Sequence, residues 1–166
     1  MSMITLLLIR HDEVAGLLES PLTIRGMPIY EEALPPPFVL SLALEQNCEW
    51  TIPRLFVDET ENAVVGSGGF KRPPADAQIE IGYGVATRCR GRGVATEGVR
   101  QLVAEAFGSA EVAEVIAETA VHNLASRRVL QKIGFEWVGQ SDDVADGLVD
   151  CWSLKKTPAP TLSARR

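Results

Sequence analysis

The sequence predicts an α/β domain, because stretches with the two-residue period of a strand alternate with stretches of helical period. In segment 78–85, every second residue is a large apolar one, as in a β-strand. Soon afterwards apolar residues recur at helical spacing and a glycine ends them: Ala95, Val99, Leu102, Val103 and Ala106, then Gly108. The chain has 166 residues, 46% of them hydrophobic, which is enough for one core. We expect a single domain over 1–155 and a flexible tail over 156–166.

The first half of the chain predicts strands and helices joined by turns. Proline fits the first position of a helix, so Pro36 or Pro37 is expected to start the second helix. The stretch from Pro21 to Pro37 is expected to be a loop with one helical turn. The predicted elements are a strand over 3–10, a helix over 11–19, a helix over 38–46, and strands over 54–58, 63–70 and 78–85.

The second half of the chain continues the alternation. A helix follows the turn at 88–93, and an apolar run over 112–119 predicts the next strand. Asn123 is expected to cap a helix over 123–133, which Gly134 ends. A final pair of strands is expected on either side of Asp146 and Gly147, a turn-forming pair.

Composition excludes some classes of function. The net charge of −6 repels a phosphate backbone, so we expect no nucleic-acid partner. The apolar start over residues 4–9 is too short to cross a membrane. The three cysteines, Cys48, Cys89 and Cys151, have no paired spacing, which predicts a reduced, cytoplasmic setting and no metal site.

The run from Arg88 to Glu97, RCRGRGVATE, looks like a phosphate cradle. Gly91 and Gly93 let backbone amides approach a ligand closely, and the helix that follows points its unpaired N–H groups at the same place. Three arginines add positive charge there, which favours a pyrophosphate or a ribose phosphate. The alternative is a solvated basic loop.

Two other nucleotide-binding motifs fit this run less well. A dinucleotide-binding turn needs a third glycine, and Thr96 stands in its place, although Glu118 near the end of the next strand mimics the acidic ribose ligand. A triphosphate-binding loop ends in Lys-Ser or Lys-Thr, whereas this loop continues as Arg92-Gly93-Val94.

Together with NLASRRVLQKIGF at 123–135, the segment RGRGVATE resembles the GNAT superfamily of acyl-CoA-dependent N-acetyltransferases. Arg90, Gly93 and Ala95 match the family signature in order. The second segment resembles the branch of ribosomal-protein N-terminal acetyltransferases (RimJ/RimL-like). The resemblance covers roughly 54–154. It implies a GNAT-like mixed, mostly antiparallel central sheet with helices on both faces.

The resemblance also implies acetyl-CoA as the cosubstrate and a set of residues that hold it. The pyrophosphate is expected on the cradle, and the pantetheine arm on the end of the preceding strand and on Asn123. The expected cofactor-binding residues are Val85, Arg90, Gly91, Arg92, Gly93, Val94, Ala95, Thr96 and Asn123.

Glu80 is the candidate base. An alkyl ammonium must lose a proton before it can attack a thioester, so the reaction requires an acceptor for that proton. On a strand, Glu80 shares a face with Gly82 and points away from Ile79 and Ile81. The alternative is a strand glutamate exposed on a solvated face.

Ser126 is the candidate partner of the leaving thiolate. Many members of the family carry a tyrosine where this chain has Leu130, so that role needs another group. Ser126 lies one turn before Leu130 on the apolar side of the helix. The equally weighted alternative is a small residue at a tight packing contact. For Asn123 the helix cap and the pantetheine contact are both expected.

These residues predict an N-acetyltransferase in which an amine attacks acetyl-CoA directly in a ternary complex. The acceptor is either a small-molecule amine or a protein N-terminal amine. Residues among the first fifty, including Tyr30, Glu31, Glu32 and Trp50, are expected to build the acceptor side of the cleft. The sequence leaves open whether the protein forms a homodimer. The alternative function is a non-catalytic CoA-binding or regulatory module, which Leu130 favours.

Overall fold

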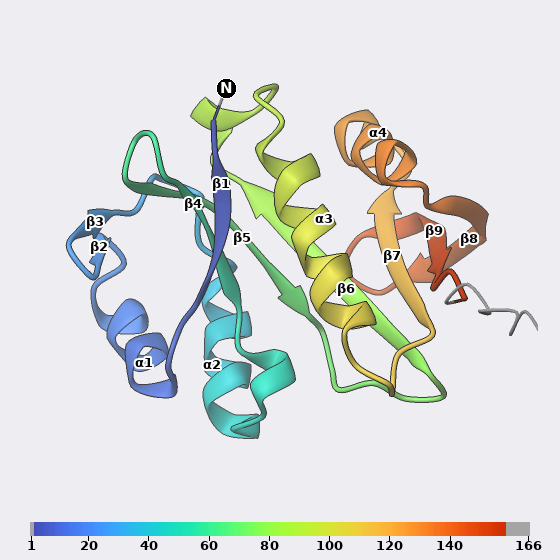
Figure 1. Cartoon of the computed structure of the whole chain (residues 1–166), viewed down its shortest axis with the longest axis horizontal. Helices are drawn as coiled ribbons and strands as arrows, with labels where there is room; N and C mark the ends of the chain where they lie inside the picture. Colours follow the sequence, from blue (N-terminus) through green and yellow to red (C-terminus); the bar gives the residue numbers. More distant parts are fainter. Residues whose placement is uncertain (1, 159–166) are drawn as a thin grey trace, which may run out of the picture.

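A seven-stranded sheet forms the centre of the computed structural model, which describes residues 2–158 (Figure 1). The strand order is β1-β4-β5-β6-β7-β9-β8. Neighbouring strands are antiparallel except for β6 and β7, which are parallel. The strands are β1 (Ile4–Leu8), β4 (Arg54–Asp58), β5 (Ala63–Phe70), β6 (Gln78–Val85), β7 (Glu114–Ala120), β8 (Glu136–Asp143) and β9 (Gly147–Lys155). The predicted mixed, mostly antiparallel sheet is confirmed.

Four α-helices cover the two faces of this sheet. They are α1 (His11–Glu19), α2 (Pro37–Gln46), α3 (Val94–Phe107) and α4 (Leu124–Ile133), and two short 3-10 helices, η1 (Glu49–Thr51) and η2 (Thr87–Cys89), join the strands. α3 and α4 lie on one face (Figure 1), whereas α2 lies over the residues of β5 and β6 that point the other way. The predicted position of every main helix is confirmed to within a few residues.

The segment before α2 differs from the prediction. Instead of a loop with a helical turn, it contains a hairpin of β2 (Thr23–Ile24) and β3 (Met27–Pro28). Arg25 and Gly26 form its two-residue turn, both with positive φ (48° and 79°), as such tight hairpins require. Arginine seldom takes that conformation, and for that reason the sequence pattern did not reveal the turn.

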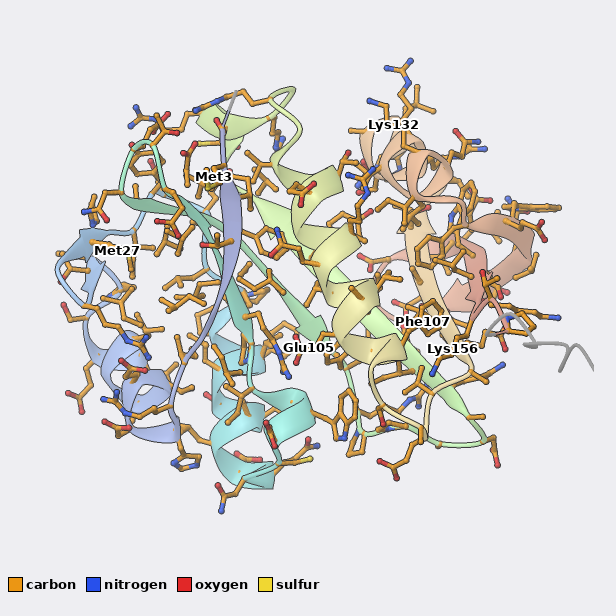
Figure 2. The ribbon with its side chains drawn as sticks, in the orientation of Figure 1. Met3, Met27, Glu105, Phe107, Lys132 and Lys156 are labelled. Atoms are coloured by element: carbon orange, nitrogen blue, oxygen red, sulfur yellow. The ribbon has the colours of Figure 1, made fainter. Side chains whose placement is uncertain are left out.

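Glycines hold α3 close to the sheet. A Cβ added to Gly98 would lie 2.5 Å from the Phe56 ring, and one added to Gly68 would lie 2.7 Å from Leu102 of the helix. Phe56 is therefore fully buried between the helix and strands β4 and β5. At the other end, Glu105 of α3 (Figure 2) pairs with the buried guanidinium of Arg54. These contacts fix where the first turn of α3 begins.

The last two strands confirm the predicted pair, and their turn over 144–146 ends at the expected Asp146-Gly147. Pairing continues slightly beyond β9, because the backbone N–H of Lys156 donates to the carbonyl of Ala113. Most of the tail expected over 156–166 falls on residues 159–166, which lie outside the described residues.

Candidate functional site

The parallel strands β6 and β7 separate halfway along their length. Their last pair is Ile81 with Ala117, so the backbone of 82–85 has no strand partner on the β7 side within residues 2–158. On its other side this segment stays paired with β5, as far as Val85 with Gly66. We call this gap between β6 and β7 the splay. It leaves N–H and carbonyl groups of β6 open to an extended ligand, which can bind there as an added strand does.

Directly after this splayed end, the chain forms the predicted cradle. Gly91 and Gly93 have φ values of 74° and 80°, conformations that favour glycine, and Gly93 caps α3. A Cβ built on either glycine meets nothing within 4 Å, so both backbones face open space. The first N–H groups of α3, beginning at Val94, have no acceptor within the helix and favour an anion.

The three arginines of the cradle have different partners. Arg92 bonds to Glu61 and to Asp58, with 3.3 Å between its Nη2 and Asp58 Oδ2, so its side chain is directed to the β4–β5 turn. Arg88 stacks on the Tyr30 ring at 4.3 Å. Arg90 is exposed and forms no ion pair with any residue in 2–158. Neither Arg88 nor Arg90 pairs with a carboxylate within these residues, so both charges are available to a ligand, whereas Arg92 offers its backbone.

Asp58 helps to hold Arg92 in place. Burial alone would raise the pKa of its carboxyl. Hydrogen bonds from Ser2 and from the N–H groups of Thr60 and Glu61, together with the charge of Arg92, outweigh burial and lower that pKa. Asp58 therefore stays ionised and anchors the arginine.

On the opposite side of the splay, α4 begins at Asn123. The Asn123 Oδ1 accepts a hydrogen bond from the backbone N–H of Ser126 at 3.1 Å, so the predicted helix cap is confirmed. Ser126 is half-buried, and Leu130, one turn later, is fully buried. The roles of Asn123 and Ser126 toward a ligand stay predictions.

Tyr83 is a residue of this site that the sequence did not single out for chemistry. It lies on the end of β6 that has no partner on the β7 side, and its hydroxyl donates across the splay to the backbone carbonyl of Ser126 at 3.3 Å. Burial raises the pKa of Tyr83 to about 12, although its bond to Ser126 acts in the opposite direction. The phenol is therefore neutral at ordinary pH and is a hydrogen-bond donor. Because Tyr83 fits the alternating pattern of a strand, the sequence contained no separate sign that its hydroxyl would donate a hydrogen bond here.

Glu80 is buried, with 10% of its side chain exposed, so the exposed alternative is wrong. Its carboxylate pairs with the ammonium of Lys71 and, at 3.3 Å, with Arg72 Nη2. Glu118 on β7 faces the same way and lies 3.9 Å from the Lys71 ammonium. Two carboxylates and two cations therefore gather where β6 and β7 begin to part.

A cleft of about 500 Å³ opens on the sheet face opposite α3. One wall comes from α2, where the exposed side chains of Phe38 and Leu42 are apolar. Glycines from β5 and β6 line its floor, so few side chains fill it. The side chain of Lys71 also lines the cleft. The β8–β9 turn closes the far side with Asp143 and Asp146.

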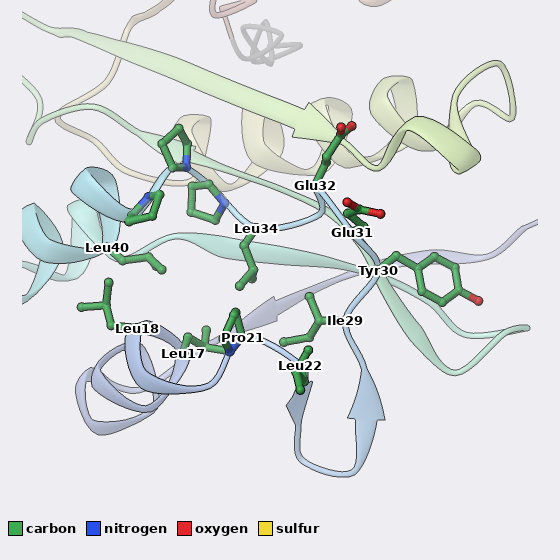
Figure 3. A pocket seen from close by; sticks show the side chains of 13 residues that line it. Leu17, Leu18, Pro21, Leu22, Ile29, Tyr30, Glu31, Glu32, Leu34 and Leu40 are labelled. Atoms are coloured by element: carbon green, nitrogen blue, oxygen red, sulfur yellow. The ribbon is translucent and has the colours of Figure 1, made fainter.

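A second, apolar pocket of about 740 Å³ lies between α1, the hairpin and the prolines before α2 (Figure 3). The Tyr30 ring points away from its leucines, toward Arg88. Glu32 accepts a hydrogen bond from Thr87 beside the cradle. Trp50 packs edge-on against Phe70 with 5.2 Å between ring centres. Tyr30, Glu31 and Glu32 line this pocket, and neither they nor Trp50 line the cleft over β5 and β6. Their part in the acceptor side stays a prediction.

Within residues 2–158, no helix is long and apolar enough to cross a membrane. The same residues contain no group of three histidine, cysteine or acidic side chains placed to hold a metal ion. Cys89 in the cradle is fully buried, and burial raises the pKa of its thiol, which disfavours a nucleophilic role.

Comparison with known proteins identifies the family. Residues 32–136 match the acetyltransferase (GNAT) domain, so the chain belongs to that family. The FsC-acetyl coenzyme A-N(2)-transacetylase of Aspergillus fumigatus is 42% identical over 61 residues, which are 37% of this chain and 26% of that protein. The chain thus spans about a quarter of that relative, and 36% of a second curated relative from Bacillus subtilis.

Solved structures share the fold over almost the whole chain. The ribosomal-protein-S5-alanine acetyltransferase from Vibrio fischeri has a TM-score of 0.66 at 18% identity, covering 93% of this chain and 96% of that one. The aminoglycoside acetyltransferase AAC(6')-Ib in complex with coenzyme A has a TM-score of 0.65 at 19% identity, covering 93% and 95%. The GNAT-like fold is confirmed.

Proposed function

We propose that this protein is an N-acetyltransferase that moves an acetyl group from acetyl-CoA to a primary amine by direct attack in a ternary complex. The observation that carries the proposal is the join of the splayed strand β6 to a glycine cradle at the start of α3, in a chain of the GNAT family. The end of β6 offers an extended backbone that suits a pantetheine arm, and the start of α3 directly after it offers an anion site that suits a pyrophosphate.

Acetyl-CoA would lie along this join. Backbone N–H groups from Gly91 to Thr96 hold the pyrophosphate, and the charge of Arg90 assists them. The end of β6 at Val85 holds the pantetheine arm, with the amide of Asn123 across the splay. The bound thioester supplies the acetyl group.

Proton transfers fall to side chains at the splay. Glu80 takes the proton of the acceptor ammonium, directly or through water, once that ammonium has displaced its lysine partner. Ser126 donates a hydrogen bond to the departing sulfur in place of the tyrosine that Leu130 replaces. Tyr83, neutral and beside Ser126, is a second donor within reach of the same region.

The acceptor amine would enter through the 500 Å³ cleft, because this cleft lies on the face that Glu80 shares with Gly82. The apolar wall of α2 and the carboxylates of the β8–β9 turn favour a cationic amine with an apolar part. The named relatives act on very different amines, a ribosomal-protein alanine and an aminoglycoside among them. A small-molecule amine and a protein N-terminal amine are both in keeping with the cleft, and three free cysteines support a cytoplasmic setting.

The second candidate function is a CoA-binding or regulatory module without catalysis. One observation favours it: Lys71 and Arg72 both pair with Glu80, so the proposed base already has partners when no acceptor is bound. Thiol release from acetyl-CoA, measured over a panel of amines and peptides, separates the two. Release that depends on an amine supports the transferase. Calorimetric binding of CoA with no release on any acceptor supports the module.

A further inference from the structure

The Lys71 side chain lines the cleft assigned to the acceptor amine, and its ammonium pairs with Glu80. Lys71 begins the β5–β6 connection, where its backbone N–H donates to the carbonyl of Glu80 at 2.9 Å and so fixes the start of its side chain. The side chain then crosses β6: a Cβ built on Gly82 would lie 3.8 Å from the Lys71 Cε. Gly82 is the first residue of β6 beyond the last β6–β7 pair. A primary amine of the chain itself therefore reaches the point at which the strands part.

The groups around this amine are those that an acceptor requires. Its ammonium pairs with Glu80, the proposed base, and lies 3.9 Å from a carboxylate oxygen of Glu118. About half of the Lys71 side chain is exposed, so the amine is not sealed in the core. Arg72, the other cation that pairs with Glu80, has a guanidinium that stays protonated and is therefore not a nucleophile for a thioester.

We propose that Lys71 is an internal acceptor, acetylated by acetyl-CoA bound to the same molecule. The inference rests on the proposed function, since it uses the same cosubstrate and the same base. The Lys71 ammonium gives one proton to the Glu80 carboxylate, and its neutral nitrogen attacks the thioester carbonyl carbon. A C–N bond forms, the C–S bond breaks, and CoA leaves as a thiolate that takes up the second proton lost by the lysine nitrogen. The products are Nε-acetyl-Lys71 and CoA.

Acetylation would change the cleft as well as the residue. The amide of acetyl-Lys71 carries no charge, so the ion pairs to Glu80 and Glu118 are lost. Glu80 would keep only Arg72, and the cleft would become more negative. A cationic acceptor would then meet less competition for Glu80, so the modified protein should bind such an acceptor more tightly.

The test is to incubate the full chain with acetyl-CoA and no added acceptor, and to follow each lysine by peptide mass spectrometry. Lys132 on α4 (Figure 2) is exposed and serves as the control in the same molecule. We expect one acetyl group, on Lys71, gained at least about tenfold faster than on Lys132, because an amine held at the reaction site gains effective concentration. The rate constant should not depend on protein concentration.

Two variants sharpen this test. Lys71→Arg keeps the charge and should abolish the single fast acetylation. Glu80→Gln should slow acetylation of Lys71 and leave that of Lys132 unchanged. Equal rates at Lys71 and Lys132, or a rate constant that rises with protein concentration, would overturn the proposal.

The same preparation also separates this inference from the function on which it rests. CoA binding and thiol release with free amines are measured in parallel. Transfer to free amines with Lys71 unmodified overturns the internal acceptor and leaves the transferase in place. Failure to bind acetyl-CoA overturns both.

Discussion

The cradle and the acceptor cleft are built by different means. The cradle is continuous in sequence, from Val85 to Thr96, and its geometry lies in the backbone: two glycines with positive φ and the first turn of a helix. The acceptor cleft gathers side chains from α2, β5, β6 and the β8–β9 turn, which are far apart in the chain. A ligand common to a family can be held by backbone, whereas the variable ligand is selected by side chains.

This difference explains what the sequence could and could not predict. Glycines, caps and apolar periods are local signals, so the glycine turn before α3, the Asn123 cap and most elements were predicted closely. Ion pairs are not local: nothing in the pattern placed Lys71 on Glu80, or Arg92 on Asp58. The hairpin at Arg25 was missed because an arginine with positive φ is an exception to turn preferences.

The largest effect is expected at the cradle, from Gly93→Asp. Gly93 faces open space at the start of α3, so a carboxylate there would meet the phosphates and cancel the attraction of the helix end. We expect CoA affinity to fall by roughly a hundredfold, from a charge term and a steric term of about 1.4 kcal/mol each. Calorimetry measures it, and circular dichroism reports the fold.

Gly93→Asn is the matched control, because it has the same size and backbone strain without the charge. It should retain at least about tenfold more affinity for CoA than Gly93→Asp. If both variants bind CoA as the wild type does while folded, the cradle does not hold the phosphates.

The next effect is expected at the boundary of the two regions. Glu80→Gln keeps size and hydrogen bonding but removes the base, so turnover at neutral pH should fall by roughly a hundredfold, with CoA affinity unchanged. The loss should shrink as pH rises, because solvent then supplies the free amine. Glu118→Gln, which alters the more distant carboxylate, should have a smaller effect. Wild-type turnover by Glu80→Gln at a saturating acceptor would remove Glu80 from the mechanism.

A smaller loss is expected from Ser126→Ala on the cosubstrate side. One hydrogen bond to the sulfur is worth about 1.4 kcal/mol, so turnover should fall by about tenfold. The defect lies at the leaving group, so a thioester of a more acidic thiol should restore the rate, whereas raised pH should not. If the more acidic thiol fails to rescue Ser126→Ala and instead rescues Tyr83→Phe, the tyrosine is the donor.

The smallest effect concerns stability at the contact between α1 and the β2–β3 hairpin. Hydrogen bonds from Arg25 in the hairpin lower the pKa of Glu13 on α1 to about 2, from an ordinary 4.5. A carboxyl with a depressed pKa stabilises the fold above its ordinary pKa and loses that contribution as pH falls from about 4.5 toward 2. Because Arg25 is partly exposed, Glu13→Gln should cost about 1 kcal/mol at pH 7.

Urea unfolding at several pH values measures this contribution. The stability difference between wild type and Glu13→Gln should be constant above about pH 5, fall steadily below it and vanish only below about pH 2. A difference that persists unchanged at pH 2 would show that the effect comes from packing rather than from the charge.

The measurement that tests the two-region account most directly is the initial velocity of thiol release while acetyl-CoA and a working amine are varied together. The cradle begins α3, whereas the cleft opens on the sheet face opposite α3, so both ligands should be bound at once, and double-reciprocal lines should intersect. Parallel lines would mean that the acetyl group passes through a covalent enzyme intermediate, and would contradict direct attack in a ternary complex.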